Sequence, residues 1–198
     1  MLSQHASLTR SVDPTADPVL RSEIKHHLRV DASNIDDDGY IDSLTAAATA
    51  QLEHDADIRI MAQTWQLRLD TFPTGNEVIT LDRPPVTSVT SVTYYDGDDV
   101  SQTLAASNYS VDTSTSPGRI KLTLNNTWPT TRSQRPAAVL VTFVAGFSTV
   151  PTAAAHAIKI LVSHWYEHRE SVVFGQTLHV VQAYWGLVDQ LRWRSPVA

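Results

Sequence analysis

The sequence contains no cysteine, which excludes a disulfide framework and any metal site built from thiolates. Glycine is also scarce, with 7 among 198 residues, and no glycine-rich phosphate loop is present. No apolar run approaches the roughly 20 residues that cross a bilayer, and the N-terminus lacks the basic start and apolar centre of a signal peptide. We therefore expect a chain that stays out of membranes, is not exported, and owes its stability to packing or to partners.

The chain also has no excess of basic residues over acidic ones. The chain has 15 lysines and arginines against 21 aspartates and glutamates, which gives a formal net charge of -6. A surface that holds nucleic acid has to neutralise phosphates, so we expect DNA to be contacted only in passing, without sequence-specific binding. With 42% hydrophobic residues the chain can bury a real core, as one domain or as one domain with a large insertion.

The first part of the chain predicts a flexible arm and two helices. Residues 1–18 are polar and show no apolar periodicity, so they predict a flexible N-terminal arm. From residue 19 to residue 57 apolar residues recur at helical spacing, interrupted by a polar loop at residues 31–39. The apolar stripes of these two helices are Val19, Leu20, Ile24 and Leu28, then Ile41, Leu44, Ala48 and Leu52. The other face of the first helix is basic, with Arg21, Lys25 and Arg29.

From Gln63 the pattern changes to the alternation of a half-buried strand, and β-branched runs separated by turn sequences continue to residue 147. The predicted strands are residues 63–71, 78–81, 86–95, 100–104, 109–111, 120–124 and 138–147. We therefore predict an α+β fold, in which a helical bundle frame carries an inserted antiparallel β module at residues 61–147. The frame has two N-terminal helices, then one long and one short C-terminal helix.

One motif points to catalysis. His164-x-x-Glu167-His168 matches the inverted zinc-protease pattern, in which two histidines hold zinc while the glutamate polarises a water molecule. A catalytic site needs a third protein ligand, and only Glu170 and Asp189 remain downstream, neither in a recognisable context. The interpretation that we favour is an ordinary helix that leaves these three side chains partly solvated. We accordingly predict no catalytic residue, no metal site and no cofactor.

A second motif reproduces the first part of an EF-hand calcium loop. Asn34, Asp36 and Asp38 alternate, and Gly39 follows at the position of the sharp turn. The twelfth position is Thr45, where calcium needs a bidentate carboxylate. The acidic residues also stand at the start of a predicted helix, where exposed N–H groups favour negative charge. The residues leave calcium binding open.

A series of short motifs extends over about residues 19 to 175. Its members are Leu28–Asp31, Asp36–Asp38, Gln63–Trp65, Ile79–Val89, Val92–Asp96, Pro117–Ile120, Trp128–Pro129, Val141–Phe147, Val150–Pro151 and His164–Glu170. In this order and at this spacing they resemble the head-tail connector (head-completion adaptor) proteins of tailed bacteriophages, which also occur in gene transfer agents. In that family the last of these runs is an ordinary helical segment.

The resemblance implies a structural adaptor of a phage or phage-like particle, and no enzymatic activity. Such an adaptor forms a ring of about twelve copies, which joins the capsid portal to the tail or its stopper protein and surrounds the DNA channel. It would reside in the virion at the head-tail interface, and in the host cytoplasm during assembly. The connector domain would comprise residues 19–175, with helices at 19–57 and 151–170.

Residues 176–198 are predicted to be a C-terminal partner-docking segment, because they carry too many large apolar groups for a solvated tail. The anchors that would dock on the portal are Tyr184, Trp185, Leu187, Leu191 and Trp193. Two alternatives remain. A zinc-dependent hydrolase would use His164, Glu167 and His168, and would bind stoichiometric zinc. A stand-alone β-sandwich binding module would be a monomer that keeps its fold without other virion proteins.

Overall fold

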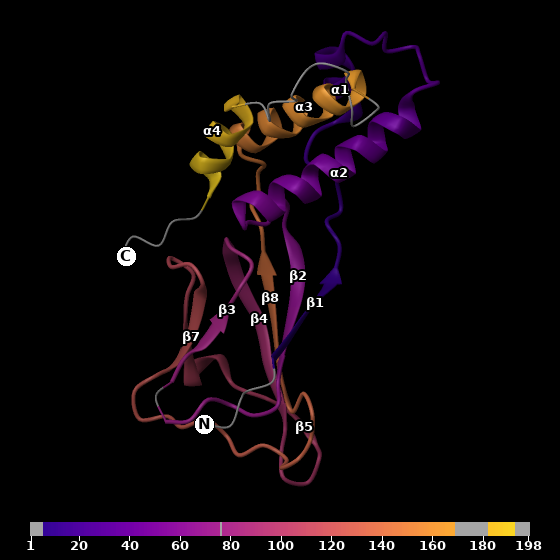
Figure 1. Ribbon diagram of the computed structural model, residues 1–198. Coiled ribbons are helices and arrows are strands. Elements are labelled where there is room, and N and C mark those ends of the chain that lie inside the picture. Colours follow the sequence, from indigo (N-terminus) through magenta and orange to yellow (C-terminus); the bar gives the residue numbers. More distant parts are fainter. Residues whose placement is uncertain (1–5, 76, 169–181, 193–198) are drawn as a thin grey trace. The chain divides into compact units, whose positions relative to one another are not determined.

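The structure is a computed structural model that describes residues 6–75, 77–168 and 182–192 (Figure 1). The described chain forms two compact units. The β unit comprises residues 6–14 and 62–147 apart from residue 76, and the helical unit comprises residues 15–61, 148–168 and 182–192. Because the β unit interrupts the helical unit in sequence, the predicted α+β class with an inserted antiparallel β module is confirmed.

Four helices form the helical unit: α1 (Arg21–Leu28), α2 (Asp38–Ala56), α3 (Thr152–Glu167) and α4 (Gln182–Leu191). Helices α2 and α3 contact each other, and α1 and α4 each contact both of them. The side chains between them are mostly aliphatic, and the fully buried members include Ile24, Ile41, Leu52, Ile158, Val162 and Val188. Buried alanines at Ala48, Ala154 and Ala157 let the helices approach closely. None of the described helices combines the length and the apolar character needed to span a membrane.

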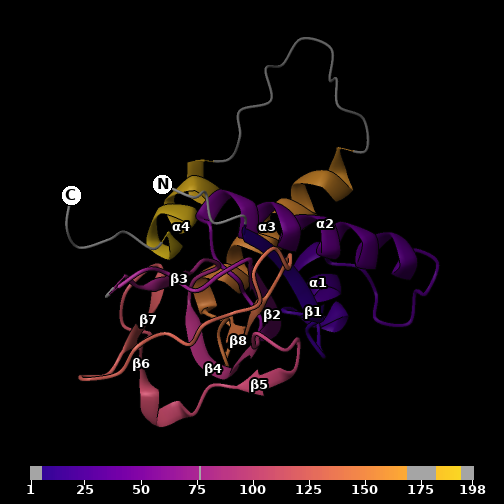
Figure 2. The same ribbon diagram turned by 90° about the horizontal axis from the view of Figure 1, so that it is seen from below.

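The β unit consists of two antiparallel sheets (Figures 1 and 2). The larger sheet has the strand order β1-β2-β8-β4-β5, and the smaller has the order β3-β7-β6. Their bounds are β1 (Ala6–Val12), β2 (Gln63–Leu69), β3 (Ile79–Leu81), β4 (Val86–Tyr95), β5 (Ser101–Thr103), β6 (Tyr109–Asp112), β7 (Gly118–Leu122) and β8 (Val139–Ala145). A short 3-10 turn, η1 (Ala106–Asn108), precedes β6.

Strand β8 is the central strand of the larger sheet, paired with β2 on one edge and with β4 on the other. Its residues alternate between fully buried Val139, Val141, Phe143 and Ala145 and half-buried neighbours. This period of two places every second side chain in the core, which continues through Leu69, Leu81, Val92 and Ile120 of the other strands. The core of the β unit therefore lies between its two sheets.

The structure corrects the predicted flexible arm at residues 1–18. Residues 6–12 form β1, which pairs with β2 from Ala6 opposite Leu69 to Val12 opposite Thr64. The residue pattern of this segment is too polar to predict a strand. An edge strand needs few buried side chains, because its backbone makes the hydrogen bonds to the neighbouring strand. Here Leu8 is the side chain that packs against the core. Residues 1–5 lie outside the described part of the chain.

The short C-terminal helix that the sequence predicts for the frame is α4, which packs within the helical unit and not in a separate C-terminal segment that begins at residue 176. Tyr184 and Val188 of this helix are buried against α2 and α3. They stand four residues apart, and that spacing puts both on one face of the helix. Residues 176–181 and 193–198 lie outside the described residues. Helix α3 begins and ends within the predicted range of 151–170.

Candidate functional site

Helix α4 has an inner and an outer face, and its inner face is anchored by Tyr184. The Tyr184 side chain is 1% exposed, and its hydroxyl donates a hydrogen bond to Asp55 Oδ2 at 2.7 Å. Burial, reinforced by the neighbouring Asp55 carboxylate, raises the pKa of the Tyr184 hydroxyl well above its usual value. Arg192 adds a second tie, because its Nη2 donates to the backbone oxygen of Asp55 at 3.0 Å. The helix is thus held on the C-terminal turn of α2.

The outer face of α4 presents Trp185 to solvent. This side chain is 40% exposed, and its ring meets the Tyr184 ring edge-on, with centroids 5.4 Å apart. Leu187 and Leu191 are half-buried, and Trp193 lies outside the described residues. Of the five anchors that the sequence predicts, Tyr184 therefore belongs to the core of the helical unit, and Trp185 is the exposed aromatic group.

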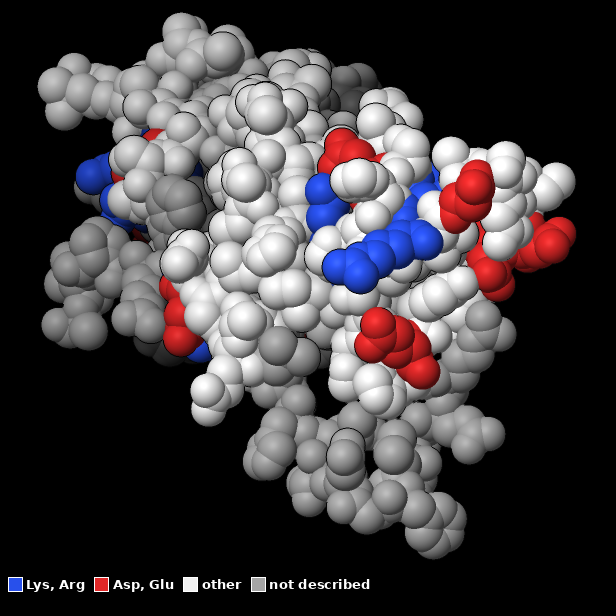
Figure 3. Space-filling view, turned by 90° about the horizontal axis from the view of Figure 1, so that it is seen from above, with Lys and Arg blue, Asp and Glu red and all other residues white. Residues whose placement is uncertain are grey.

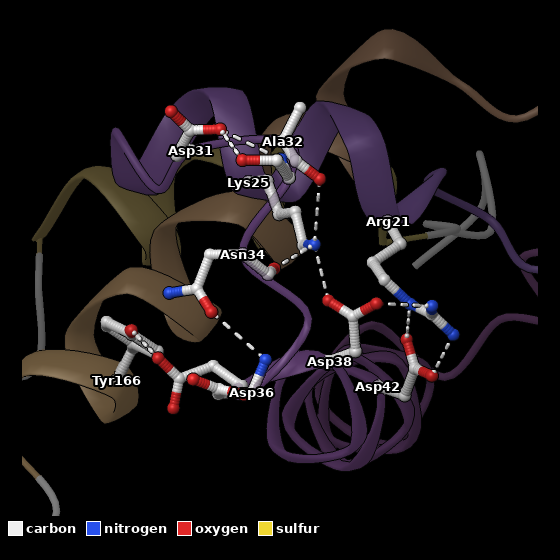
Figure 4. A network of polar contacts seen from close by, with 11 residues as sticks. Arg21, Lys25, Asp31, Ala32, Asn34, Asp36, Asp38, Asp42 and Tyr166 are labelled. Atoms are coloured by element: carbon white, nitrogen blue, oxygen red, sulfur yellow. Dashed lines mark hydrogen bonds and ion pairs between the residues drawn. The ribbon is translucent and has the colours of Figure 1, made fainter.

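A second feature of the helical unit is the loop between α1 and α2, which we call the Ile35 loop (residues 31–37). Lys25 of α1 is 5% exposed, and its Nζ lies 2.6 Å from the backbone oxygen of Asn34 and 2.5 Å from Asp38 Oδ1 (Figure 4). Arg21 reaches the same carboxylate at 2.9 Å and also pairs with Asp42. The hydrogen bond from Lys25 lowers the pKa of Asp38, and the charge of Arg21 adds to this effect.

Three further hydrogen bonds fix the backbone of the Ile35 loop. Asp31 accepts bonds from the Ser33 backbone and hydroxyl, and Asn34 Oδ1 accepts one from the Asp36 backbone. From α3, the Tyr166 hydroxyl donates to Asp37 Oδ2 at 2.7 Å. The loop is therefore tied to three helices, yet the Ile35 side chain at its tip is 73% exposed.

The sequence did not predict this arrangement. It assigned Lys25 to an exposed basic face, whereas the structure buries this residue beside Ile24. The reason is that the loop carbonyls and Asp38 supply the polar partners that a buried ammonium group requires. The available signal was Asp38, an acidic residue thirteen positions downstream at the start of the next helix.

The EF-hand-like motif lies in the same place. Asp38, the third of its alternating positions, directs its carboxylate at Lys25 and Arg21. A calcium ion at this position would have to displace both cations. Asp37 and Asp38 have therefore found partners in the neighbouring helices, at the place where the sequence left calcium binding open.

The zinc-protease motif lies at the end of α3. The rings of His164 and His168 are 4.9 Å apart, and His168 Nδ1 lies 3.0 Å from the backbone oxygen of His164. Among the described residues, no group of three or more histidine, aspartate or glutamate side chains could hold a metal ion. Asp189 lies on α4, and Glu170 is outside the described residues. The motif thus brings two histidines together without a third ligand from the described chain.

No protein-family model and no curated protein matches the sequence, whereas solved structures do. A chain from the neck of an empty gene transfer agent (GTA) particle, computed with C6 symmetry, has a TM-score of 0.72 and 22% identity. The match covers 97% of this chain and 98% of that one. A chain from the virion of a native GTA particle has a TM-score of 0.70 and 21% identity, over 96% of this chain and 98% of that one.

A third match is a chain from the neck of a native GTA particle, computed with C12 symmetry. It has a TM-score of 0.70 and 22% identity, and covers 97% of this chain and 98% of that one. The chain therefore shares its fold, helical frame and β module together, with chains of GTA particles. The fold that the connector resemblance implies is confirmed over nearly the whole length.

Proposed function

We propose that the chain is a structural adaptor in the neck of a phage-like particle, where its copies form a ring around the DNA channel. The observation that carries this proposal is the fold shared with GTA neck chains over 97% of the sequence. The C6 and C12 symmetries of those particles support a cyclic assembly of about twelve copies. The net charge of -6 supports a channel through which DNA passes without being held.

Within such a ring, the adaptor would join the portal to the tail or its stopper protein, and its role would not be enzymatic. It would reside in the virion at the head-tail interface, after assembly in the host cytoplasm. The zinc alternative would need a third ligand from another molecule or from residues outside the described chain, since the described residues bring only His164 and His168 together.

We place the portal-docking surface on the outer face of α4. Its anchor among the described residues would be Trp185. Leu187 and Leu191 stand three residues after Tyr184 and Val188 and so lie towards the buried face, where they would add contacts only at its edge, and Trp193 would contribute from outside the described residues. The support for this proposal is that Trp185 is exposed while the Tyr184 hydrogen bond to Asp55 holds the helix in place. An exposed aromatic group on a fixed element loses little entropy on binding, which is typical of interface hot spots.

The test is to mix the purified chain with the portal of the same particle and to examine the complex by electron microscopy. We expect a ring stacked on the portal. Trp185→Ala should weaken portal binding about thirtyfold, as expected for a hot-spot loss of about 2 kcal/mol. Gln190→Ala, an exposed position on the same helix, is the matched control and should bind as the wild type does. Unchanged portal binding by the Trp185 variant would move the docking surface elsewhere, and a chain that ignores the portal would contradict the adaptor role.

A further inference from the structure

We propose that His164 and His168, at the end of α3, form a bidentate site for a late first-row divalent cation such as Ni²⁺ or Zn²⁺. The site goes beyond the adaptor role and does not depend on it. It also differs from the zinc-hydrolase alternative, because two protein ligands can chelate a metal ion without forming a catalytic centre. The sequence predicts no metal site, since a third ligand is missing, whereas the structure shows how the two histidines are arranged.

The distance between the two rings suits a shared metal ion. His164 and His168 stand four residues apart, which places them on one face of the helix, and their ring centroids are 4.9 Å apart. Histidine nitrogens bind zinc at about 2.0–2.1 Å, so two imidazoles on one ion have ring centres about 4.5–5.2 Å apart for bond angles of about 90–109°. The observed separation lies within this range, so both rings can reach one ion without a change in the helix.

A hydrogen bond fixes the tautomer of His168. Its Nδ1 lies 3.0 Å from the backbone oxygen of His164, and a carbonyl oxygen can only accept a hydrogen bond, so Nδ1 carries the proton. In a neutral imidazole the other nitrogen, Nε2, then keeps its lone pair and is the atom that would bind the metal. Histidines that bind metals almost always donate their other N–H to a carboxylate, a backbone carbonyl or a water molecule. His168 already has such an acceptor.

The last turn of α3, which carries the two histidines, is held in place by its neighbours. The Tyr166 hydroxyl donates to Asp37 Oδ2 at 2.7 Å, and the Tyr40 hydroxyl donates to the backbone oxygen of Trp165 at 3.4 Å. Trp165 and Tyr166 lie between the two histidines in sequence, so the backbone of the pair is fixed before any metal binds. A site that is preorganised in this way loses little conformational entropy on binding.

The surroundings of the pair favour a cation. The pair lies at the C-terminus of α3, where carbonyl groups without helical partners give the helix end a partial negative charge. Glu167 is exposed and adds a carboxylate directly before His168. Acidic side chains are also exposed on the face of the molecule that Figure 3 shows, and the formal net charge of the chain is -6. A cation is therefore attracted to the chain and not repelled by it.

The donor atoms select the class of metal ion. Neutral imidazole suits Zn²⁺, Cu²⁺ and Ni²⁺, whereas Mg²⁺ and Ca²⁺ prefer oxygen ligands. Among the described residues no third histidine, aspartate or glutamate completes a metal site with this pair. Water molecules would take the remaining coordination positions, so we expect weaker binding than at a structural zinc site with four protein ligands. His168 is exposed, which lets a hydrated ion reach the pair.

The test is isothermal titration of the full chain with NiCl₂ at neutral pH. We expect one equivalent of Ni²⁺ to bind at the pair. His164→Ala and His168→Ala should each weaken this binding at least about tenfold, which is the loss that removal of an outer partner of a metal ligand already causes. Because a chelate needs both rings, the double variant should lose little more than either single variant. Circular dichroism checks that each variant keeps its helices.

Two control variants separate the pair from the other histidines. His54→Ala removes an exposed histidine of α2 that has no second histidine three or four residues away, and His26→Ala with His27→Ala removes two neighbours on α1. Both should keep the equivalent of Ni²⁺ bound at the pair, and MgCl₂ should show no binding there. The inference is overturned if the wild-type chain binds no Ni²⁺, if the single variants bind it unchanged, or if their losses multiply in the double variant. None of these results bears on the adaptor role, which is tested with the portal.

Discussion

Lys25 is the residue on which the shape of the Ile35 loop depends most. A buried ammonium group is tolerated only when it is paired and hydrogen-bonded, and Lys25 meets this requirement with Asp38 and the Asn34 carbonyl. The same contacts show why sequence patterns misplace it. Its partners come from a loop whose path follows from the packing of α1 and α2, and periodicity contains no information on that path.

Replacement of Lys25 by methionine should destabilise the chain. Methionine fills a similar volume but leaves the Asn34 carbonyl without its donor, so we expect a loss of about 1–3 kcal/mol in the free energy of unfolding. Urea denaturation followed by circular dichroism measures this loss. Lys121→Met on β7, where the lysine is exposed, is the control and should unfold as the wild type does. Equal midpoints for both variants would mean that the buried contacts contribute nothing.

Asp112 provides a prediction about pH. Hydrogen bonds from Ser114 and Arg119 lower the pKa of its carboxyl group from 3.8 to about 2. Because the folded pKa lies below the ordinary value, the carboxylate favours the fold above pH 3.8, and this contribution is lost as the pH falls towards 2. Asp112→Asn should therefore lower the melting temperature at pH 7 more than at pH 3. A difference that grows on acidification would have the wrong sign.

At the scale of elements, the strands were predictable where alternation was strong and were missed where it was weak. The seven strands predicted between residues 63 and 147 correspond to β2 through β8. Strand β1 was not predicted, because a strand at the edge of a sheet requires little apolar surface. The apolar residues of α4 predicted that something covers this helix. Only the folded structure shows that the Tyr184 hydroxyl bonds to Asp55, whereas Trp185 stays exposed.

The close approach of β7 to β4 yields a prediction at this scale. A Cβ atom at Gly118 would lie 3.1 Å from two side-chain carbons of Val86, which is buried and stiff. Gly118→Ala should thus cost about 1–3 kcal/mol of stability through overpacking, measured by thermal or urea unfolding. Gly97→Ala is a suitable control, because nothing lies within 4 Å of its added methyl group. Equal stability of the two variants would show that Val86 can move aside.

At the scale of the whole molecule, the order of elements predicted the frame and its insertion, because two helices, a run of strands and further helices can hardly be arranged otherwise. The short C-terminal helix of the predicted frame is α4, but the residues that hold it there could not be predicted, since they are side-chain contacts between segments more than 100 residues apart. The exposure of Ile35 and Trp185 could not be predicted from the sequence either. Periodicity indicates that a face is apolar, but exposure after folding decides whether Ile35 or Trp185 is available to a partner.

The way in which the chain enters and leaves the β unit has a consequence for engineering. The inserted part of the unit, residues 62–147, begins with β2 and closes with β8, and Gln63 stands directly opposite Ala145 in this pair. The backbones at such a position are about 5 Å apart, so the intervening strands form a cassette whose two ends nearly touch. A short turn could join those two ends directly. Segments of other lengths could also replace the strands between them, without lengthening the connections to α2 and α3.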